Sequence, residues 1–286
     1  MEPGDLTRRF GVAGDVIVAR GKVDDELIDA VRRSSRPLLV LNRELGFDEV
    51  DCAVLREVGD RLVGLEVSGA FDDDSDVVHC SNLEELNLNT PCSGDLDWGQ
   101  LTGLTRLFVY EDRISSTFPA LRALESLHVH RASDDQVVLA SSLPRLVDLT
   151  LSSTRMRAVR SLAGFQDRLA RLWIRGGSSV DGFDDLAELG AMRALLLDSC
   201  RRLDDLNFVA GMSDLEVLAV SDCGVVESLR PLLQCSRLRM LHFDGSTNIR
   251  DGDLSVLGQL SSLSGAYFQK RRHYRGAPPG FPTRDD

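Results

Sequence analysis

The sequence predicts an α/β solenoid, with a parallel β-sheet on its concave side and short helical, 3-10 or irregular segments on its convex side. A pattern of the form Leu-x-x-Leu-x-Leu recurs at one phase along most of the chain. Within each copy, apolar and polar residues alternate, as in Leu65, Glu66 and Val67. Such alternation is typical of a strand with one buried face, and connections near 20 residues allow neighbouring strands to run parallel. One repeat cannot bury its own leucines, so the stack is the folding unit.

The repeats keep a narrow period. Consecutive first positions lie 20 to 23 residues apart, with a step of 25 before the last copy, and this period is within the range of short solenoid repeats. The nine clear copies begin at Leu62, Leu83, Leu104, Leu124, Leu146, Leu169, Met192, Leu215 and Leu238, and a weaker copy begins at Leu263.

These copies resemble the leucine-rich repeat family over about residues 36–268. The segments from Asp185 to Met192 and from Ser228 to Cys235 are similar to the short 20–23-residue class of bacterial, internalin-type proteins. The resemblance implies a horseshoe with a parallel concave sheet. The chain departs from the family where an Asn usually closes each strand, because other residues stand there: Ala70, Pro91, Asp112, Ala132, Thr154, Gly177, Cys200, Cys223 and Ser246.

The chain divides by pattern into an N-terminal cap over 1–35, about ten repeats over 36–268, and a C-terminal segment over 269–286. In the cap we expect an edge strand over 14–20 and a short amphipathic helix over 24–33.

The C-terminal segment is basic, with five cations and two acids in 270–286. We expect residues 269–275 to cap the stack, with Tyr274 packed on the last repeat. The alternative is that this segment is a ligand for an acidic partner. The Pro/Gly-rich residues 276–280 are predicted to be disordered.

The 286 residues include 33 Lys and Arg against 45 Asp and Glu, a formal charge of −12. An acidic chain lacks the basic face that nucleic-acid binding demands, so we expect no nucleic-acid partner. The apolar runs are too short for a membrane span, and no secretory signal stands out at the N-terminus. We therefore expect a cytoplasmic, monomeric protein without a membrane partner.

Two residue sets are candidates for chemical sites. His128 and His130 share one strand face, but without a third ligand they predict no metal site. The carboxylates of Asp198, Asp222 and Asp244 come from consecutive repeats and are the basis of the alternative function, an enzyme or a cation-binding protein. No nucleotide-binding, zinc or hydrolase motif accompanies them, so we expect no enzyme, metal or cofactor.

The six cysteines are expected to be reduced, structural thiols. Cys200 and Cys223 share the ninth repeat position, and Cys80 and Cys235 both lie three residues before a repeat-opening Leu. Fixed phase indicates a fixed structural role, and cytosolic thiols stay reduced.

The outward positions of the strands are the most informative for function, because equivalent positions of successive repeats lie side by side. Aromatic and Arg residues, the types enriched in interface hot spots, gather at the middle repeats. The predicted partner-binding residues are Arg106, Phe108, Tyr110, His128, His130, Arg171, Trp173 and Arg175. An apolar strip follows, formed by Leu196, Val217, Ala219 and Met240.

We therefore expect a protein–protein interaction module that binds its partner through the concave sheet. An inhibitor or immunity protein would use the acidic surface to attract a basic partner. An adaptor would bind a regulatory enzyme more weakly.

Overall fold

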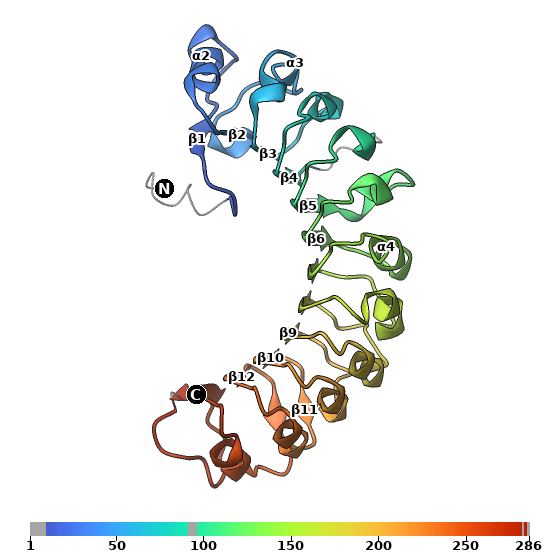
Figure 1. Ribbon diagram of the computed structural model, residues 1–286. Coiled ribbons are helices and arrows are strands. Elements are labelled where there is room, and N and C mark those ends of the chain that lie inside the picture. The colour runs from blue at the N-terminus through green and yellow to red at the C-terminus, as the bar shows by residue number, and fades with distance from the viewer. Residues whose placement is uncertain (1–9, 91–95, 282, 285–286) are drawn as a thin grey trace. The chain divides into compact units, whose positions relative to one another are not determined.

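The computed structural model describes residues 10–90, 96–281 and 283–284, and the first nine residues of the predicted N-terminal cap, together with Cys92, lie outside them. The chain forms two compact units (Figure 1). Unit 1 comprises residues 1–130 and 142–146, and unit 2 comprises residues 131–141 and 147–286. In each unit, parallel strands line one side and helical segments the other.

Unit 1 contains six described strands that pair in chain order. They are β1 (Asp15–Val18), β2 (Pro37–Asn42), β3 (Gly64–Ser68), β4 (Glu85–Asn89), β5 (Arg106–Tyr110) and β6 (Ser126–His130). The helices are α2 (Asp25–Arg33) and α3 (Leu55–Val58), and the 3-10 segments are Arg43–Leu45, Gly59–Arg61, Ser75–His79, Trp98–Gln100, Glu111–Arg113 and Phe118–Ala120.

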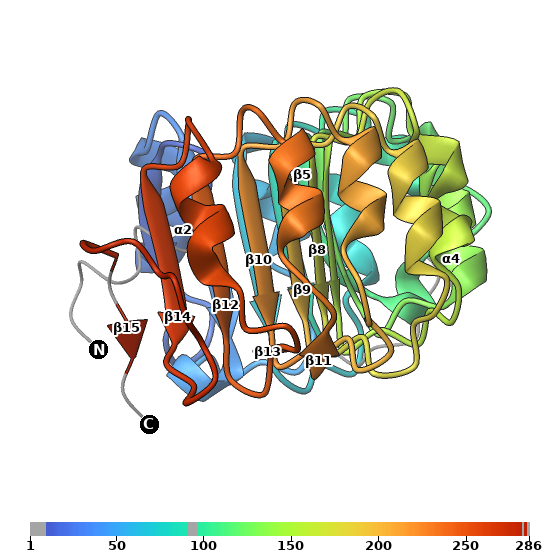
Figure 2. The same ribbon diagram turned by 90° about the horizontal axis from the view of Figure 1, so that it is seen from below.

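Unit 2 repeats this arrangement, and Figure 2 shows its strands beside a row of helical segments. Its main sheet contains β7 (Asp148–Ser152), β8 (Arg171–Arg175), β9 (Ala194–Asp198), β10 (Val217–Ser221), β12 (Met240–Asp244), β14 (Gly265–Gln269) and β15 (Thr283–Arg284), and a separate pair contains β11 (Val225–Val226) and β13 (Asn248–Ile249). The helical segments are α4 (Asp134–Ala140) and the 3-10 segments Val159–Phe165, Phe183–Glu188, Asn207–Gly211, Arg230–Gln234 and Leu254–Gln259.

The strand register confirms the repeat phase within each unit. Leu65 pairs with Leu86, which pairs with Leu107 in unit 1, and Leu172 pairs with Leu195 in unit 2. The repeat leucines are buried, and burying each one contributes roughly 1.5–3 kcal/mol relative to leaving it exposed. The connections are mostly 3-10 because that helix rises about 2.0 Å per residue and returns the chain in fewer residues than an α-helix.

In seven of the described repeats the turn after the strand has a left-handed residue at the eighth repeat position. Gly69, Gly176 and Gly245 serve in three repeats, and other residues adopt the same conformation elsewhere. The non-glycine members are Arg131, Ser153, Ser199 and Asp222, with φ between 47° and 65°. Because this conformation costs L-residues roughly 1–2 kcal/mol, the packing of the stack must enforce it.

At the ninth repeat position, other polar side chains make hydrogen bonds in place of the missing asparagines. The Thr154 hydroxyl donates to the Ala132 carbonyl over 2.9 Å, and the Cys223 thiol donates to the Ser221 carbonyl over 3.2 Å. In the following repeat the buried residue is Thr247, not the expected Ser246, which is exposed. Small hydroxyl and thiol side chains therefore donate hydrogen bonds to buried backbone carbonyls in these turns.

The predicted strand and helix near the N-terminus are confirmed as β1 and α2. The Asp24 carboxylate caps α2 by accepting from the Leu27 N–H, and Val31 is buried beneath it. At the other end Tyr274 packs against Phe268 and Phe243, with ring centroids 6.5 and 6.3 Å away, which confirms the predicted contact.

The prediction of disorder over residues 276–280 is wrong. The described chain there runs back over the last repeat, where the space beside Gly258 is closed by the Pro278 ring. It then pairs as β15 in parallel with β14, Phe268 opposite Thr283. Pairing with an open sheet edge supplies backbone partners that composition alone does not reveal.

Candidate functional site

The predicted binding residues fall into two groups, one in each unit. Arg106, Phe108, Tyr110, His128 and His130 belong to unit 1, and Arg171, Trp173 and Arg175 belong to unit 2. The first group lies on the adjacent strands β5 and β6 and the second on β8 alone, in both cases at outward positions, and we call this side of each unit the open sheet face.

In unit 1 the register places two aromatic–histidine pairs side by side. Phe108 is opposite His128 and Tyr110 is opposite His130 on β5 and β6. The ring centroids lie 4.5 Å apart in the first pair and 4.8 Å apart in the second, both edge to face. Such geometry stabilises each pair by about 0.5–1.5 kcal/mol beyond area burial. The rings form a rigid platform and are partly exposed.

Polar residues of β4 extend this platform. The Tyr110 hydroxyl donates to Asn89 Oδ1 over 3.1 Å, and Asn87 is opposite Phe108 in the register. A shallow hollow of about 180 Å³ lies here, and its lining includes Glu85, Arg106 and Phe108. Rigid aromatic edges beside polar groups suit a protein interface.

Arg106 is exposed, and the chain near the N-terminus lies beside it. A side chain at Gly11 would place its Cβ 2.8 Å from Arg106 Nε, so the chain near the N-terminus lies against this guanidinium. Glu85 accepts from the N–H groups of Gly11 and Val12 over 2.7 and 3.1 Å. Burial raises the pKa of the Glu85 carboxyl, although these two hydrogen bonds oppose the shift.

In unit 2 the site centres on Trp173, which is 36% exposed on β8. The Arg175 guanidinium carbon lies 4.6 Å from the centroid of its ring, a cation–π contact. Arg171 pairs with Asp148 of β7 over 2.7 Å. The indole lies outside the core of the unit, which the leucines on the other side of the strands form.

The apolar strip beside Trp173 is also on this face. Leu196 of β9 is opposite Trp173, and Ala219 of β10 is opposite Leu196. Met240 on β12 is 46% exposed. Next to it, His242 and Tyr267 pack with centroids 4.7 Å apart.

The three strand-end carboxylates are each engaged locally. Asp198 accepts from the Ser199 hydroxyl, and Asp222 accepts from the Ser246 N–H over 2.9 Å. Asp244 lies 3.0 Å from His242 Nε2. Asp222 sits in the left-handed turn position, so its role is to cap the next turn. Among the residues that the structure describes, no group of three His, Cys, Asp or Glu is arranged to hold a metal.

Sequence reasoning missed a polar hollow on the open face of unit 1, with a volume of about 410 Å³. Its lining contains carboxylate, amide and hydroxyl groups from the ends of β2, β3 and β4. These residues are Asn42, Glu44, Glu66, Ser68, Gly69, Asn87 and Asn89. The available signal was the run of polar outward residues Glu66, Ser68, Asn87 and Asn89.

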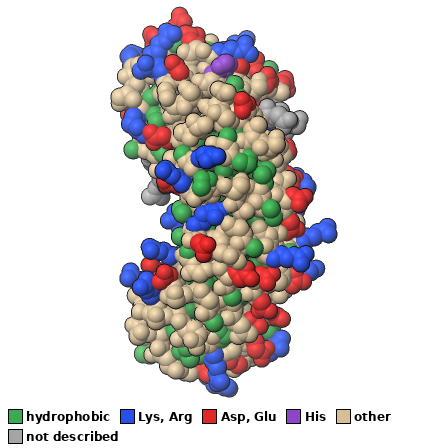
Figure 3. Space-filling view, turned by 45° about the vertical axis from the view of Figure 1, so that its right-hand side comes forward, with side chains coloured by type: hydrophobic (Ala, Val, Ile, Leu, Met, Phe, Trp, Pro, Cys, Tyr) green, Lys and Arg blue, Asp and Glu red, His purple; other side chains and the backbone are tan. Residues whose placement is uncertain are grey.

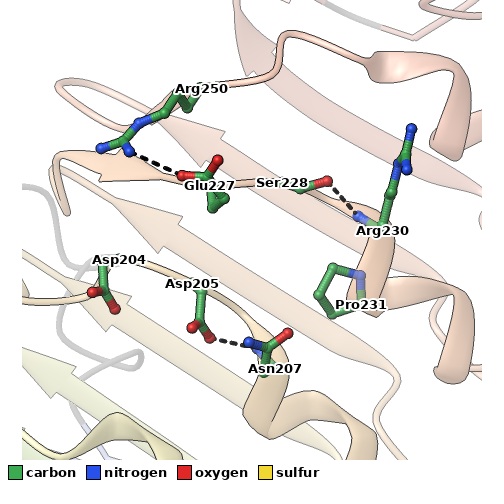
Figure 4. A pocket seen from close by; sticks show the side chains of 8 residues that line it. All are labelled: Asp204, Asp205, Asn207, Glu227, Ser228, Arg230, Pro231 and Arg250. Carbon is green, nitrogen blue, oxygen red and sulfur yellow. Dashed lines mark hydrogen bonds and ion pairs between the residues drawn. The ribbon is translucent and has the colours of Figure 1, made fainter.

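A second hollow, of about 580 Å³, lies in unit 2 away from the open face (Figure 4). One ion pair lies within its lining, where Arg250 bridges to Glu227 over 3.0 Å. Asp205 accepts from the Asn207 N–H over 2.7 Å. On the face shown in Figure 3, carboxylates and cations likewise intermingle.

The strands, the register and the buried leucines together define a leucine-rich-repeat fold. The chain is similar in structure to an internalin, inlF, from Listeria monocytogenes, with a TM-score of 0.59 and 16% identity over 92% of this chain and 77% of that chain. It is also similar to internalin C2, inlC2, from the same organism, with a TM-score of 0.52 and 21% identity over 65% of this chain and 83% of that chain. No family model and no curated protein matches the sequence.

The helices in the described part of the chain are all too short or too polar to span a bilayer.

Proposed function

We propose that the protein binds a partner protein through the open faces of its sheets, as an inhibitor or immunity protein or as an adaptor. The observation that carries this proposal is the pair of aromatic clusters at outward strand positions. Trp173 with Arg175 forms one, and Phe108 with His128 and the adjoining Tyr110–His130 pair forms the other. Aromatic and Arg side chains are the typical anchors of protein interfaces.

The charge of the chain supports a basic partner. With a formal charge of −12, the protein attracts positively charged molecules. Salt limits this attraction to distances of about the Debye length, roughly 8 Å at physiological ionic strength. Electrostatic attraction of this kind raises the association rate more than the final affinity. We place the monomeric protein in the cytoplasm, where thiols stay reduced.

The test begins with capture of a partner by the full chain, followed by affinity measurements on single variants. Trp173→Ala is expected to weaken binding by roughly 30-fold, as for a buried aromatic anchor. Phe108→Ala tests the aromatic cluster of unit 1 and is expected to weaken binding by a similar factor. Both variants should stay folded and lose only a few degrees in melting temperature, because they remove one ring contact each and leave the leucine core intact.

The matched control is Glu188→Ala, an exposed residue of unit 2 on a 3-10 segment away from the strands. It should bind within about threefold of the wild type. If Trp173→Ala and Phe108→Ala bind normally while Glu188→Ala loses affinity, the helical side is the interface and the proposal is wrong.

The salt dependence separates the two roles. An inhibitor of a basic partner should associate at a rate that falls steeply as ionic strength rises. An adaptor for a partner without a basic surface should show a nearly constant rate.

A further inference from the structure

A short stretch before β1, residues 10–14, lies against the open face of unit 1, and we call it the strap. These described residues belong to no helix or strand. The strap contacts outward side chains of β2, β4 and β5. It therefore covers part of the face to which we assign partner binding.

The Phe10 side chain of the strap fills an apolar pocket on this face. Leu38 and Val40, at outward positions of β2, form a buried cluster with Phe10 and Val63. Room for the ring comes from Gly64, which is opposite Leu38, because a Cβ there would lie 3.1 Å from the Phe10 ring. Phe10 is only 7% exposed, so the pocket accepts a whole aromatic ring.

The backbone of the strap is held by side chains and not by sheet pairing. The N–H groups of Gly11 and Val12 donate to one oxygen of the Glu85 carboxylate, over 2.7 and 3.1 Å. Arg36 Nε donates to the Ala13 carbonyl over 3.0 Å. A segment held by one buried ring and a few hydrogen bonds opens locally at a much lower cost than a core strand does.

The strap also borders the aromatic cluster of unit 1. Glu85 and Arg106 line the hollow of about 180 Å³ beside Phe108. A Cβ at Gly11 would lie 2.8 Å from Arg106 Nε, so the strap stands directly at this hollow. A partner that docks on Phe108 and reaches Arg106 therefore meets the strap.

From these contacts we propose that the strap is an internal competitor of the partner protein. The pocket and Glu85 form a groove for an extended segment of the partner. In the bound state an aromatic ring of the partner replaces that of Phe10, and two consecutive backbone N–H groups replace those of Gly11 and Val12. This inference rests on the proposed function and names the regulation of its site in unit 1. A closed strap lowers the apparent affinity in proportion to the fraction of molecules whose groove is open.

The experiment uses a fluorescently labelled peptide with the sequence of the strap, Phe-Gly-Val-Ala-Gly, and measures its anisotropy as the full chain is added. In Phe10→Ala the protein lacks its own ring, so the peptide should bind and saturate. The wild type should bind the peptide at least about tenfold more weakly, because its own strap competes at a high effective concentration. A peptide with Ala in place of Phe should not bind Phe10→Ala.

A second variant releases the strap and leaves the pocket intact. In Gly14→Ala the new Cβ would lie 2.4 Å from the Arg36 carbonyl oxygen, so the base of the strap must move. This variant should also bind the peptide more tightly than the wild type. The matched control is Phe281→Ala, which removes a part-exposed ring of unit 2 and should bind the peptide as the wild type does. Thermal unfolding checks that each variant is folded.

The inference is overturned if neither Phe10→Ala nor Gly14→Ala binds the peptide more tightly than the wild type. It is also overturned if the Ala peptide binds as well as the Phe peptide, because the pocket then does not recognise the ring.

The captured partner separates this inference from the proposed function. Phe10→Ala should bind the partner several-fold more tightly, whereas weaker binding would make the strap part of the interface and overturn its role as a competitor. If Trp173→Ala weakens partner binding while the peptide binds neither strap variant, only the groove is wrong and the proposed function stands.

Discussion

Unit 1 and unit 2 hold their turns by different means. In unit 1 the turn after β5 depends on a buried charge: the Arg113 guanidinium pairs with the carboxylate of Asp74, and both residues are almost fully buried. The Arg113 carbonyl also accepts from Trp98 Nε1 over 3.0 Å. In unit 2 the turns depend on neutral hydroxyl and thiol groups at the ninth repeat position. In the same repeat fold, turns at equivalent positions are therefore held either by a buried ion pair or by neutral hydrogen bonds.

The open faces differ as well. Unit 1 presents amide, carboxylate and histidine groups around Phe108 and Tyr110. Unit 2 presents Trp173 and an apolar strip that ends at Met240. The difference shows that the residues at outward strand positions are free to vary, because the folding energy comes from the leucines on the other side of each strand.

The largest expected effect is in unit 1. Arg113→Met leaves the buried Asp74 carboxylate without its cation and should lower the free energy of unfolding by about 3–5 kcal/mol near neutral pH. Urea unfolding measures this loss. The matched control is Arg202→Met, since Arg202 and Asp181 form an exposed pair over 3.0 Å, and it should cost at most about 1 kcal/mol.

The loss in the free energy of unfolding of Arg113→Met should depend on pH. Burial already raises the pKa of Asp74, against the attraction of Arg113, and removing Arg113 raises the pKa further. A raised pKa means that the stability is complete at acid pH, where the carboxyl is protonated, and is lost as pH rises through the folded-state pKa. The deficit of Arg113→Met should therefore shrink as pH falls from the raised folded-state pKa of Asp74 toward the ordinary carboxyl value of 3.8, and should vanish below it. A deficit that stays constant from neutral to acid pH would show that Asp74 is not the cause.

A smaller effect is expected in unit 2. Thr247→Val keeps the shape of the side chain but removes its donation to the Val220 carbonyl and its acceptance from the Cys223 N–H. The expected loss is roughly 1–3 kcal/mol in the free energy of unfolding. Ser246→Ala, at the exposed neighbouring position, should be neutral. If both variants have the free energy of unfolding of the wild type, the hydrogen bonds of the Thr247 hydroxyl do not stabilise the turns of unit 2.

The smallest effect concerns the thiols of the two units. Burial raises the pKa of Cys80 in unit 1 to about 12 and that of Cys235 in unit 2 to about 11. Because both values are raised, their contribution to stability is complete at neutral pH and is lost as pH rises from about 9 through 11–12. In the folded protein these thiols should react slowly with a disulfide reagent at about pH 8.

After unfolding without reductant, titration should find all six thiols of the sequence. A deficit of two would reveal a disulfide. The structure already has Cys80, Cys200, Cys223 and Cys235 as free, buried cysteines.

The sequence by itself determined the repeats, the register within each unit, the strand and helix near the N-terminus, and the outward positions of Trp173 and Phe108. These features follow from local patterns, because alternation along a strand and the spacing of leucines decide which side chains are buried. Tyr274 could be placed on the last repeat for the same reason, since an aromatic residue just beyond the stack covers its exposed end.

Only the tertiary structure decided how polar groups are satisfied. Arg113 meets Asp74 from 39 positions away, Asp222 caps the turn of the following repeat, and β15 closes the edge of β14. Glu66 becomes buried at an outward position because Asn42 and Ser68 surround it. A hydrogen bond between repeats depends on which side chains meet across the stack, and the period of the sequence carries no information about that meeting.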